Sequence, residues 1–442
     1  MRGQVLIETA AGKQEESGPH VQQPLDAKPP TRVLLSAFAC FPGIGSEPGV
    51  GWDWAVGLAR RYDVWVMTTR LRREVVTEHA AAATINWIFV DPPAWLAPRP
   101  SGRLSLEWYY LVWQWFAFLW LRRHAAEHRI DLVHHVTLGR YWCPFLPALL
   151  PVPCVFGPVG GGDCTPRSLI RSFSLRGRLF EYLREFMRTT AAWNPLITKP
   201  ARRIDAAVAA TEATAECLRR IGCRRVETYP QCGLTQEELD LLERLPEPPA
   251  SPYRLITIAR LMPWKGIHLS LRAYAAAIGR LGPSEYWIVG SGPECERLKR
   301  LATELKLHEA VSFWEGGMSR EHLLEKLSQT NVLIHPALRE AFGNVCLEAL
   351  AAGRPVICLD SGGPALQVDD EVGVCVPLID EEQIIEGLSQ AIIRLGQDSE
   401  LRARMGRAAR ERARRCFSWD ARISWVSSLY ASVIKAADRH KP

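Results

Sequence analysis

Several features that define common protein classes are missing from this 442-residue sequence. Its twelve cysteines are scattered, and no two of them form the C-x2-C pair that a zinc site needs. The first 30 residues hold no apolar core of signal-peptide length, and they carry prolines and charges instead. We therefore expect reduced, mostly buried cysteines, and we expect residues 1–30 to form a disordered leader on a cytoplasmic protein.

The sequence also lacks the uninterrupted apolar run of roughly 20 residues that a membrane-spanning helix requires. The aromatic stretch from Trp108 to Leu121 is shorter, and Gln114 interrupts it. We therefore expect no transmembrane helix there. A buried helix is our preferred interpretation of this stretch, and the alternative is an interfacial helix whose Trp and Tyr rings enter a membrane surface.

Neither sign of charge is in large excess, because 54 basic and 48 acidic side chains leave a formal net charge of +6. This mild excess favours a phosphate-bearing ligand or an anionic membrane, and it is too mixed to indicate nucleic acid. A chain of this length with 47% hydrophobic residues can bury a large core. It is typical of a globular protein with two domains of roughly 200 residues each.

From residue 32 onward, short β-rich runs alternate with helix-favouring stretches. A first set of strands is expected over residues 32–40, 64–69, 85–91, 131–136 and 152–157. After a proline-rich acidic linker at 243–252, a second set covers residues 253–259, 286–290, 311–315, 332–335 and 356–360. This order predicts an α/β protein with two doubly wound, Rossmann-like domains facing across a cleft, and ligands bind beyond the carboxyl ends of such strands.

The loop after the first expected strand, F41-P-G-I-G-S-E-P-G-V-G51, contains four glycines before a helix expected to begin near Val50. Backbone amides near Gly49 and Gly51 could therefore approach an anion closely. The strict G-x-G-x-x-G fingerprint is absent, and no acidic residue closes a second strand at the required distance. Both absences argue against a nicotinamide-dependent dehydrogenase.

Loops of the second domain carry cations and glycines directly after strands. Arg260 and Lys265 follow the strand at 253–259 and could hold a diphosphate, although single cations at strand ends are usually only solvated. Gly290 and Gly292 lie in the V-G-S-G-P run after the next strand, and S-G-G-P at 361–364 follows a later one. Their coincidence in one domain favours a ligand site.

Two glutamates flank a predicted helix start in the same domain. A helix is expected from about Asn344 to Ala352, and it should end at Gly353. The amides of Gly343, Asn344 and Val345 would point out of the helix start toward a phosphate. Glu340 lies just outside that site and Glu348 about one turn inside the helix, so each could accept hydrogen bonds from the hydroxyls of a sugar or a ribose. Taken singly, each would be interpreted as a surface glutamate.

These motifs resemble, in order, the signature of the family-four retaining glycosyltransferases, which have the GT-B fold. The resemblance covers nearly the whole second domain and rests on Arg260 with K265-G266, V-G-S-G-P, H335-P, the segment 340–353 and S361-G-G. C416-F-S-W-D-A-R-I-S-W425 resembles the family's closing helix, which packs back on the first domain, and S46-E-P-G-V-G-W52 resembles a bacterial subgroup. The implied parts are an acceptor-binding domain at 31–245, a donor-binding domain at 251–415 and a crossover helix at 416–442.

The resemblance implies a hexosyltransferase-type enzyme that uses a nucleoside-diphosphate sugar and neither a metal nor a cofactor, which agrees with the lack of an Asp-x-Asp motif after a strand. Arg260 and Lys265 would bind the diphosphate. Glu348 would hold the ribose, and Glu340, with the backbone of Phe342 and Gly343, would contact the sugar.

Two positions depart from the family pattern. Leu366 stands where an acidic residue is usual, which puts donor preference in doubt. D131-L-V-H-H-V136 supplies His134 and His135 and then a valine, so one of the two is expected to contact donor sugar or acceptor, and the other to be a core histidine.

The acceptor is expected to be a lipid-linked or polysaccharide glycan. Residues 167–188 interleave basic with apolar side chains, as in a helix on an anionic membrane, and a solvated basic helix fits equally well. We expect peripheral contact with the inner face of the cytoplasmic membrane. The alternatives are a nucleotide-sugar 2-epimerase on the same fold and a non-catalytic nucleotide-sugar-binding protein.

Overall fold

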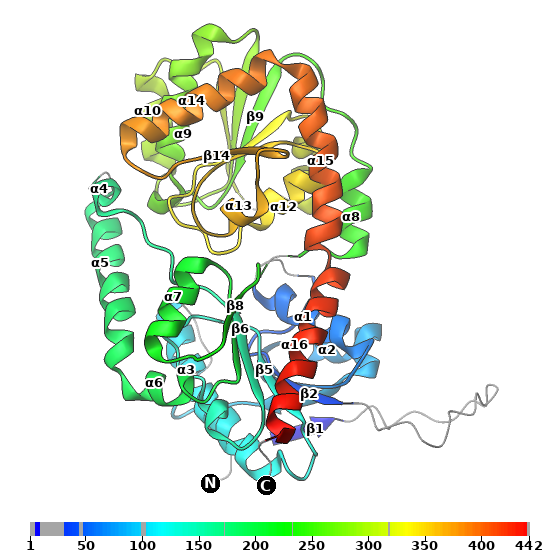
Figure 1. Cartoon of the computed structure of the whole chain (residues 1–442). Coiled ribbons are helices and arrows are strands. Elements are labelled where there is room, and N and C mark those ends of the chain that lie inside the picture. The colour runs from blue at the N-terminus through cyan, green and yellow to red at the C-terminus, as the bar shows by residue number, and fades with distance from the viewer. Residues whose placement is uncertain are drawn as a thin grey trace, which may run out of the picture.

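The computed structural model describes residues 5–8, 31–43, 47–98, 103–171, 173–231, 233–316 and 319–439. Two sheets, each flanked by helices, form two domains stacked one above the other (Figure 1). The strand order is β1-β4-β3-β2-β5-β6-β7-β8 in the first sheet and β11-β10-β9-β12-β13-β14 in the second. All neighbouring strands are parallel except β1 and β4. The predicted fold class, two doubly wound α/β domains, is confirmed.

The first sheet contains strands of three to six residues. They are β1 Val5–Glu8, β2 Arg32–Ser36, β3 Asp63–Thr68, β4 Asn86–Val90, β5 Leu132–His135, β6 Cys154–Val159, β7 Ala206–Ala209 and β8 Val226–Thr228, of which β2 to β7 are mostly buried. Strands covered by helices on both faces are apolar at successive positions, which explains the Val-Leu-Leu run of β2. The five expected strands are present, and β1, β7 and β8 are additional. Strand β1 lies within the predicted disordered leader and pairs with β4, which corrects that prediction for residues 5–8. Residues 1–4 and 9–30 of the leader lie outside the described residues.

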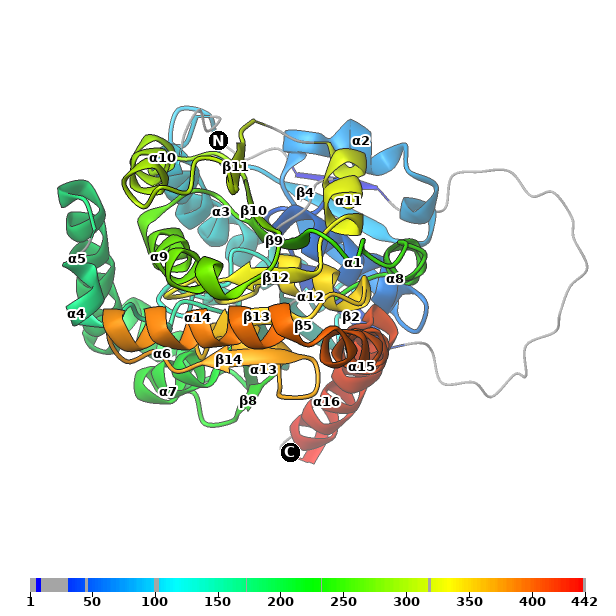
Figure 2. The same cartoon turned by 90° about the horizontal axis from the view of Figure 1, so that it is seen from above.

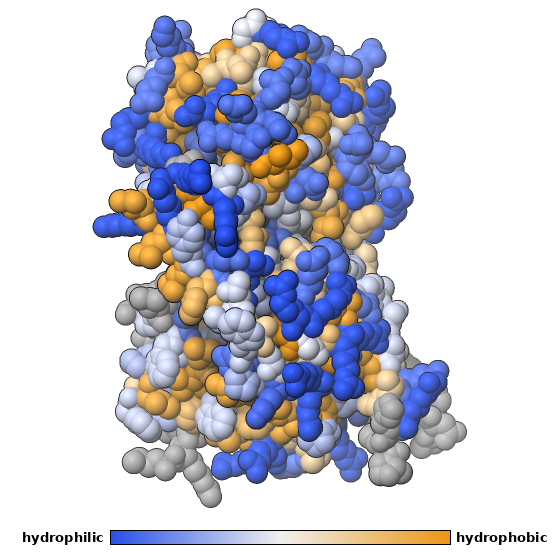
Figure 3. Space-filling view, turned by 60° about the vertical axis from the view of Figure 1, so that its left-hand side comes forward, coloured by the Kyte–Doolittle hydropathy of each residue, from blue (hydrophilic) through white to orange (hydrophobic). Residues whose placement is uncertain are grey.

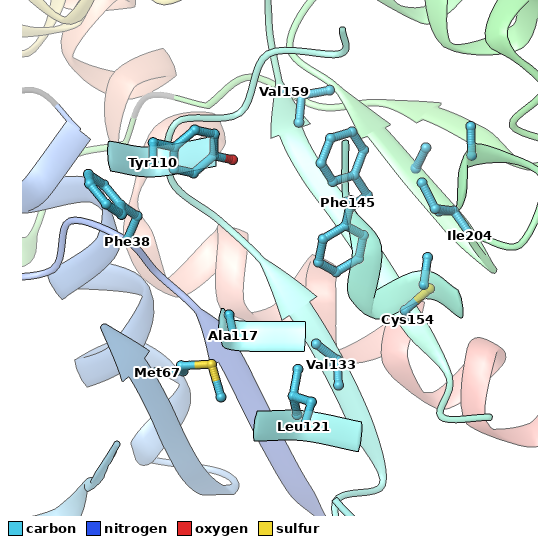
Figure 4. Packing of buried hydrophobic residues seen from close by; sticks show 14 of the residues in the cluster. Phe38, Met67, Tyr110, Ala117, Leu121, Val133, Phe145, Cys154, Val159 and Ile204 are labelled. Carbon is cyan, nitrogen blue, oxygen red and sulfur yellow. The ribbon is translucent and has the colours of Figure 1, made fainter. Parts of the chain in front are cut away.

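Helices of the first domain are α1 Glu47–Ala59, α2 Arg73–Thr77, α3 Arg103–His124, α4 Arg167–Ile170, α5 Leu175–Thr190, α6 Pro195–Ala201 and α7 Glu212–Ile221. The aromatic stretch forms α3, and Tyr110 and Trp113 on one face of it join the core around Phe38. Figure 4 shows Tyr110 beside Phe38. Gln114 is buried there because its amide donates to the hydroxyl of Tyr110 at 2.7 Å. The preferred interpretation of a buried helix is thus correct for this face.

The opposite face of α3 is partly open to solvent, because Trp108 and Trp115 are each about half exposed. The helix contains charged residues at both ends of its aromatic stretch. Over the parts of the chain that the structure describes, no helix combines the length and the hydropathy that crossing a bilayer requires.

The second sheet contains β9 Tyr253–Ile258, β10 Ser284–Val289, β11 Val311–Trp314, β12 Val332–His335, β13 Val356–Leu359 and β14 Gly373–Val376. Its helices are α9 Ile267–Ala277, α10 Cys295–Glu304, α11 Arg320–Ser328, α12 Asn344–Ala351, α13 Gly362–Gln367 and α14 Glu381–Gln397. The five expected strands are all found, and a helix follows each of the first four, as predicted. The additional strand β14 lies at the edge of the sheet.

Three segments connect the domains. The first lies before α8 (Gln236–Glu243), because Leu239 and Leu242 of this helix are buried in the core of the second domain with Leu347. Residues 244–252, the predicted linker, lead from α8 into β9 within that domain. Helix α15 (Ser399–Phe417) runs along the second domain, and α16 (Trp419–Arg439) continues onto the first (Figure 1). Ile423 of α16 packs so closely on α1 that a Cβ on Gly57 would lie 2.9 Å from it. This matches the crossover helix that the family resemblance implies; residues 440–442 lie outside the described residues.

The third connection comes from α4 and α5, which belong to the predicted first domain. Leu169, Ile170 and Phe173 are buried in the core of the second domain, together with Leu255 and Tyr274. Helix α5 lies at the edge of the molecule in both views and reaches from one domain to the other (Figures 1 and 2). Residue 245 lies between the strands of the two sheets, whereas α8 packs in the second domain and the segment from α4 to α5 reaches into it.

Candidate active site

Loops of the two domains meet at one place. A Cβ on Gly160, which follows β6, would lie 3.0 Å from the Cβ of Ala341 and 3.5 Å from the ring of Phe342. Within the second domain, the amide of Leu338 donates to the carbonyl oxygen of Trp264 at 2.9 Å. The loops after β6, β9 and β12 therefore converge, as the carboxyl ends of parallel strands predict.

Lys265 and Glu340 form an ion pair in this region, and Nε2 of His335 lies 3.6 Å from the same carboxylate. Burial alone would raise the pKa of Glu340, but His335 and Lys265 together outweigh it and hold the pKa well below its usual range. Burial lowers the pKa of His335, which favours the neutral ring. The fold thus brings together two predicted site residues that are 75 positions apart in the sequence.

Glu348 lies on α12 and forms an ion pair with Arg320, the first residue of α11. Burial raises the pKa of Glu348, and the nearby guanidinium of Arg320 opposes this rise. Arg320 also lies 3.8 Å from the carboxylate of Glu238. Arg320 is therefore a site residue that sequence reasoning missed, and a ribose at Glu348 would share the carboxylate with it.

Helix α12 begins as predicted. Gly343 caps it with a φ of +74°, and a Cβ at this position would lie 2.9 Å from Cγ of Pro364. A glycine is therefore favoured both by the left-handed backbone and by the close approach of the S-G-G-P loop. The amides of Asn344 and Val345 lie in the first turn, where backbone N–H groups have no partner within the helix. These amides are available to an anion, so the site at this helix start stays a prediction that the structure is compatible with.

The loop that contains Leu366, which departs from the family pattern, holds Phe342 and its neighbours through hydrogen bonds. Gln367 donates to the carbonyl oxygen of Phe342 at 2.6 Å, and the amide of Gly363 donates to the carbonyl oxygen of Glu340 at 2.8 Å. Leu366, which replaces the usual acidic residue, is partly exposed beside them. Gln367 thus orders the backbone around Phe342, a role that the motif alone did not indicate.

Arg260, Gly290 and Gly292 lie on two adjoining loops. A Cβ on Gly290 would lie 1.9 Å from the carbonyl oxygen of Ala259, and one on Gly292 would lie 2.4 Å from that of Leu261. Glycine is therefore needed at both positions so that the two loops can pack together. Arg260 itself is exposed, so its guanidinium is accessible to a ligand.

Gly49 and Gly51 are not loop residues, because α1 begins at Glu47 and includes both. This corrects the expected helix start near Val50. Gly51 is buried, and a Cβ there would lie 2.4 Å from the carbonyl oxygen of Ala39, so its lack of a side chain serves packing of the helix on the sheet. Gly49 lies in the first turn of α1 and is half-buried. Residues 44–46 of the predicted glycine loop lie outside the described residues.

His134 and His135 are both fully buried in the first domain. The ring of His134 contacts the hydroxyl of Tyr430 at 2.6 Å and the carbonyl oxygen of Gly157 at 2.5 Å. His135 contacts Ser36 and Tyr110 at 3.0 and 3.1 Å. Burial lowers the pKa of His134 to about 4 and that of His135 to about 3, so both rings are neutral near pH 7.

This geometry counts against a catalytic role for either histidine, because both nitrogens of each ring already have partners and no ring surface is exposed. Each histidine instead ties strand β5 to another element: His134 joins it to α16, and His135 joins it to β2 and α3. The interpretation as a core histidine, which sequence reasoning assigned to one of them, describes both.

The loop after β6 contains a second residue that sequence reasoning missed. Asp163 is buried, and burial together with the nearby charge of Glu340 raises its pKa, while Thr211 donates to its carboxylate at 3.2 Å. Arg184 of α5 holds this loop through two hydrogen bonds of 2.7 Å to the carbonyl oxygens of Gly161 and Asp163. The only sequence signal was the G-G-G-D run itself.

Arg339, directly before Glu340, binds across the domain boundary. Its guanidinium forms bidentate hydrogen bonds of 2.6 to 3.2 Å with the buried carboxylate of Glu181 on α5, and it lies 4.6 Å from the ring of Trp264. The ring of Phe180 on α5 stacks on the same tryptophan, with 5.4 Å between the centroids of the two rings. Helix α5 thus contacts the residues next to both Lys265 and Glu340.

Among the described residues, two groups of three side chains have a spacing that suits a metal ion, namely His124 with Glu127 and His128, and Cys295 with Glu296 and Glu315. Neither group includes a residue of this site. All the cysteines in the described part of the chain are free thiols, and most are buried.

Comparison with solved structures identifies the fold. Sucrose-phosphate synthase from Thermosynechococcus elongatus superposes with a TM-score of 0.63 and 20% identity, covering 92% of this chain and 100% of that one. Alr3699/HepE from Anabaena, solved in complex with UDP, superposes with a TM-score of 0.59 and 16% identity, covering 91% and 100%. At these identities the likeness shows the fold, which is the GT-B fold of glycosyltransferases.

Sequence comparison identifies the second domain more narrowly. Residues 244–412 match the family model of glycosyl transferases group 1. The match covers most of the second domain, which is therefore similar to this family in the part of the chain that carries Lys265, Glu340 and Glu348.

Two relatives match this chain over different lengths. A D-inositol 3-phosphate glycosyltransferase of Saccharomonospora viridis is 33% identical over 200 residues, which are 42% of this chain and 44% of that protein. The putative colanic acid biosynthesis glycosyltransferase WcaL of Escherichia coli K12 is 26% identical over 369 residues, which are 77% of this chain and 86% of that protein. The chain thus spans under half the length of the first relative and most of the second.

Proposed function

We propose that this protein is a retaining glycosyltransferase that moves a sugar from a nucleoside-diphosphate sugar to a hydroxyl group of a lipid-linked or polysaccharide glycan. The observation that carries the proposal is the cluster of Lys265, Glu340 and His335 beside the start of α12, within the part of the chain that matches the family of glycosyl transferases group 1. The complex of HepE with UDP supports a nucleoside diphosphate as the donor's leaving part. The names of the two relatives support a carbohydrate or an inositol phosphate as the acceptor class.

In this proposal the leaving diphosphate binds between Lys265, Arg260 and the first-turn amides of α12. Negative charge grows on the diphosphate as the bond to the sugar breaks, and fixed cations and aligned amides lower the energy of that state without having to reorganise. We expect these groups to supply the stabilisation, and we expect no cofactor besides the nucleotide sugar. The acceptor hydroxyl would attack from the face that the diphosphate leaves, which retains the configuration of the sugar carbon.

Two carboxylates would hold the donor's hydroxyl groups. Glu348 binds the ribose and exchanges part of its contact with Arg320, and Glu340 binds the sugar together with the backbone of Phe342 and Gly343. A carboxylate suits this task because it accepts two hydrogen bonds from a diol. Ionised Glu340 also keeps Lys265 in place before the donor arrives.

A nucleotide panel tests the proposal. The purified protein is heated with UDP, GDP or ADP and with the corresponding nucleotide sugars, and the melting temperature is measured. A ligand at a hundred times its dissociation constant stabilises the folded state by about 2.7 kcal/mol, which gives a clear rise. No rise with any nucleotide would contradict the proposal.

The donor that binds is then incubated with and without glycan acceptors. Nuclear magnetic resonance of the first product distinguishes retention from inversion at the sugar carbon. Conversion of the donor to an epimer without an acceptor would indicate the 2-epimerase, and binding without any turnover would indicate a non-catalytic binding protein.

A further inference from the structure

Helix α5 has its apolar and polar faces reversed relative to an ordinary surface helix. Its exposed large apolar side chains follow one helical stripe and are Leu175, Leu179, Tyr182, Leu183, Phe186 and Met187. Leu175 is 80% exposed, Leu179 70% and Phe186 63%. A surface helix normally turns such a stripe toward the core. This stripe has no partner among the described residues that would bury it.

The opposite stripe of α5 is polar and faces the protein. Gly177, Glu181 and Arg184 are buried, and they are spaced four and three residues apart. Glu181 binds Arg339, and Arg184 binds the carbonyl oxygens of the loop after β6. Charged hydrogen bonds, together with the stacking of Phe180 on Trp264, therefore hold α5 in place and leave its apolar stripe outward.

The apolar surface continues past the end of α5. Trp193 is 84% exposed and Leu196, at the start of α6, is 65% exposed. Single exposed apolar residues are common on proteins, but a stripe of six on one helix with two more beyond it marks an interaction surface. Figure 3 turns this side of the molecule toward the viewer and shows apolar side chains beside strongly hydrophilic ones.

Positive charge borders this surface. Arg167, Arg171 and Arg176 are exposed around α4 and the first turn of α5. The acidic residues between positions 167 and 190 are Glu181 and Glu185, and each is paired with an arginine. The surface therefore offers apolar side chains, aromatic rings and guanidinium groups that form no ion pair within the described part of the chain.

We propose that α5, together with Trp193 and Leu196, docks on an anionic lipid bilayer. Apolar side chains would enter the acyl boundary, Tyr182 and Trp193 suit the interfacial region, and the arginines would meet lipid phosphates. A second copy of this chain is a poorer partner, because the same positively charged surface on two copies repels itself, whereas an anionic surface attracts it. Charge complementarity thus selects the anionic membrane.

The docking surface and the candidate site share one helix. The inner face of α5 binds Arg339 next to Glu340, and Phe180 stacks on Trp264 next to Lys265. Docking would therefore place the site directly beside the membrane surface, where a lipid-linked acceptor is found. The claim that docking gives access to a lipid-linked acceptor deepens the proposed function and rests on it. The claim that α5 binds lipid is independent of that function.

Vesicle cosedimentation tests the inference with the full chain. We expect the wild type to pellet with vesicles of phosphatidylglycerol and phosphatidylcholine, and at least tenfold less with phosphatidylcholine alone. The double variant L179E/F186E should lose at least tenfold in partitioning to the anionic vesicles. Variant I379E is the matched control, because Ile379 is an exposed apolar residue outside α5. It should pellet like the wild type.

Three results would overturn the inference: no pelleting of the wild type, equal pelleting of the α5 variant, or a wild-type dimer in light scattering that the α5 variant abolishes without any lipid binding. Nucleotide-induced melting shifts, measured on the same preparations, keep the two proposals separate. A cooperative melting transition without any ligand shows that L179E/F186E is folded. Lipid binding without a nucleotide shift would contradict only the transferase, and a nucleotide shift without lipid binding would contradict only the docking surface.

Discussion

The ion pair between Lys265 and Glu340 gives the sharpest prediction, because the two residues should respond in opposite ways to substitution. In the ligand-free protein the ammonium group of Lys265 is held by Glu340. A bound diphosphate would share this ammonium group with the carboxylate. Replacing Lys265 with glutamine removes the cation from the diphosphate, whereas replacing Glu340 with glutamine removes the competitor and leaves the cation.

The magnitude for Lys265→Gln follows from the strength of a hydrogen bond to a charged group, which is about 1.5 to 3 kcal/mol. Because the diphosphate shares the ammonium group with Glu340, we take the lower end of this range. That value corresponds to about a tenfold rise in the dissociation constant of the nucleotide. For Glu340→Gln we expect the nucleotide to bind as well as before or a few-fold more tightly. Transfer should become at least tenfold slower, because the contact to the sugar is lost.

Titration calorimetry with the nucleotide selected by the melting panel measures both constants, and initial rates with the corresponding nucleotide sugar measure transfer. Arg272→Gln is the control. Arg272 lies on α9 in the same domain, and its ion pair is a long one, with 3.9 Å between its Nε and the carboxylate of Glu381. Equal weakening of nucleotide binding by Glu340→Gln and by Lys265→Gln would contradict the competition between Glu340 and the diphosphate for Lys265. The carboxylate would then only hold Lys265 in position.

Four further predictions follow from the same geometry. Glu181→Ala leaves the guanidinium of Arg339 without its carboxylate. Because breaking a buried ion pair costs about 3 kcal/mol at the low end of the usual range, the melting temperature should fall. The exposed control Glu304→Ala should not lower the melting temperature. Glu348→Gln should raise the dissociation constant of a nucleotide about tenfold while leaving that of inorganic diphosphate unchanged; equal effects on both would contradict the ribose contact. His134→Phe should lower stability by about 1 to 3 kcal/mol in urea unfolding, because the hydroxyl of Tyr430 and the carbonyl oxygen of Gly157 lose their partner, and it should leave nucleotide affinity unchanged. Glu340 has a folded pKa below its unfolded value of about 4.3, so its contribution to stability is complete above that pH and is lost as the pH falls; melting curves of Glu340→Gln between pH 7 and pH 3 should therefore decline less than those of the wild type.

The second domain was largely predictable because its signals are local. Strand β12, the turn at Gly343 and helix α12 lie within one run of about 20 residues, and their order depends on spacing, backbone freedom and helix capping. The alternation of strands and helices likewise gave the doubly wound fold. Strand β7 was missed because its Ala-Ala-Val-Ala sequence has little β-propensity by itself; it is a strand because β6 and β8 pair with it on both sides.

The histidines show where local patterns are insufficient. His134 and His135 follow one another in a strand, so they point to opposite faces of the sheet, and the sequence does not state what covers each face. The structure covers one face with α16 and the other with α3, which begin almost 300 and about 30 positions away in the chain. Both rings therefore find partners inside the protein.

The order of the elements, the glycines that let loops pack closely and the cations and carboxylates after the strands can all be read from the sequence. Which of these charges meet depends on the three-dimensional fold. It paired Lys265 with Glu340 and Arg339 with Glu181, across 75 and 158 positions, and it turned the apolar stripe of α5 outward. The physical reason is that propensity and capping act over a few residues, whereas burial and the partner of a charge depend on which distant segments the chain crossovers bring together.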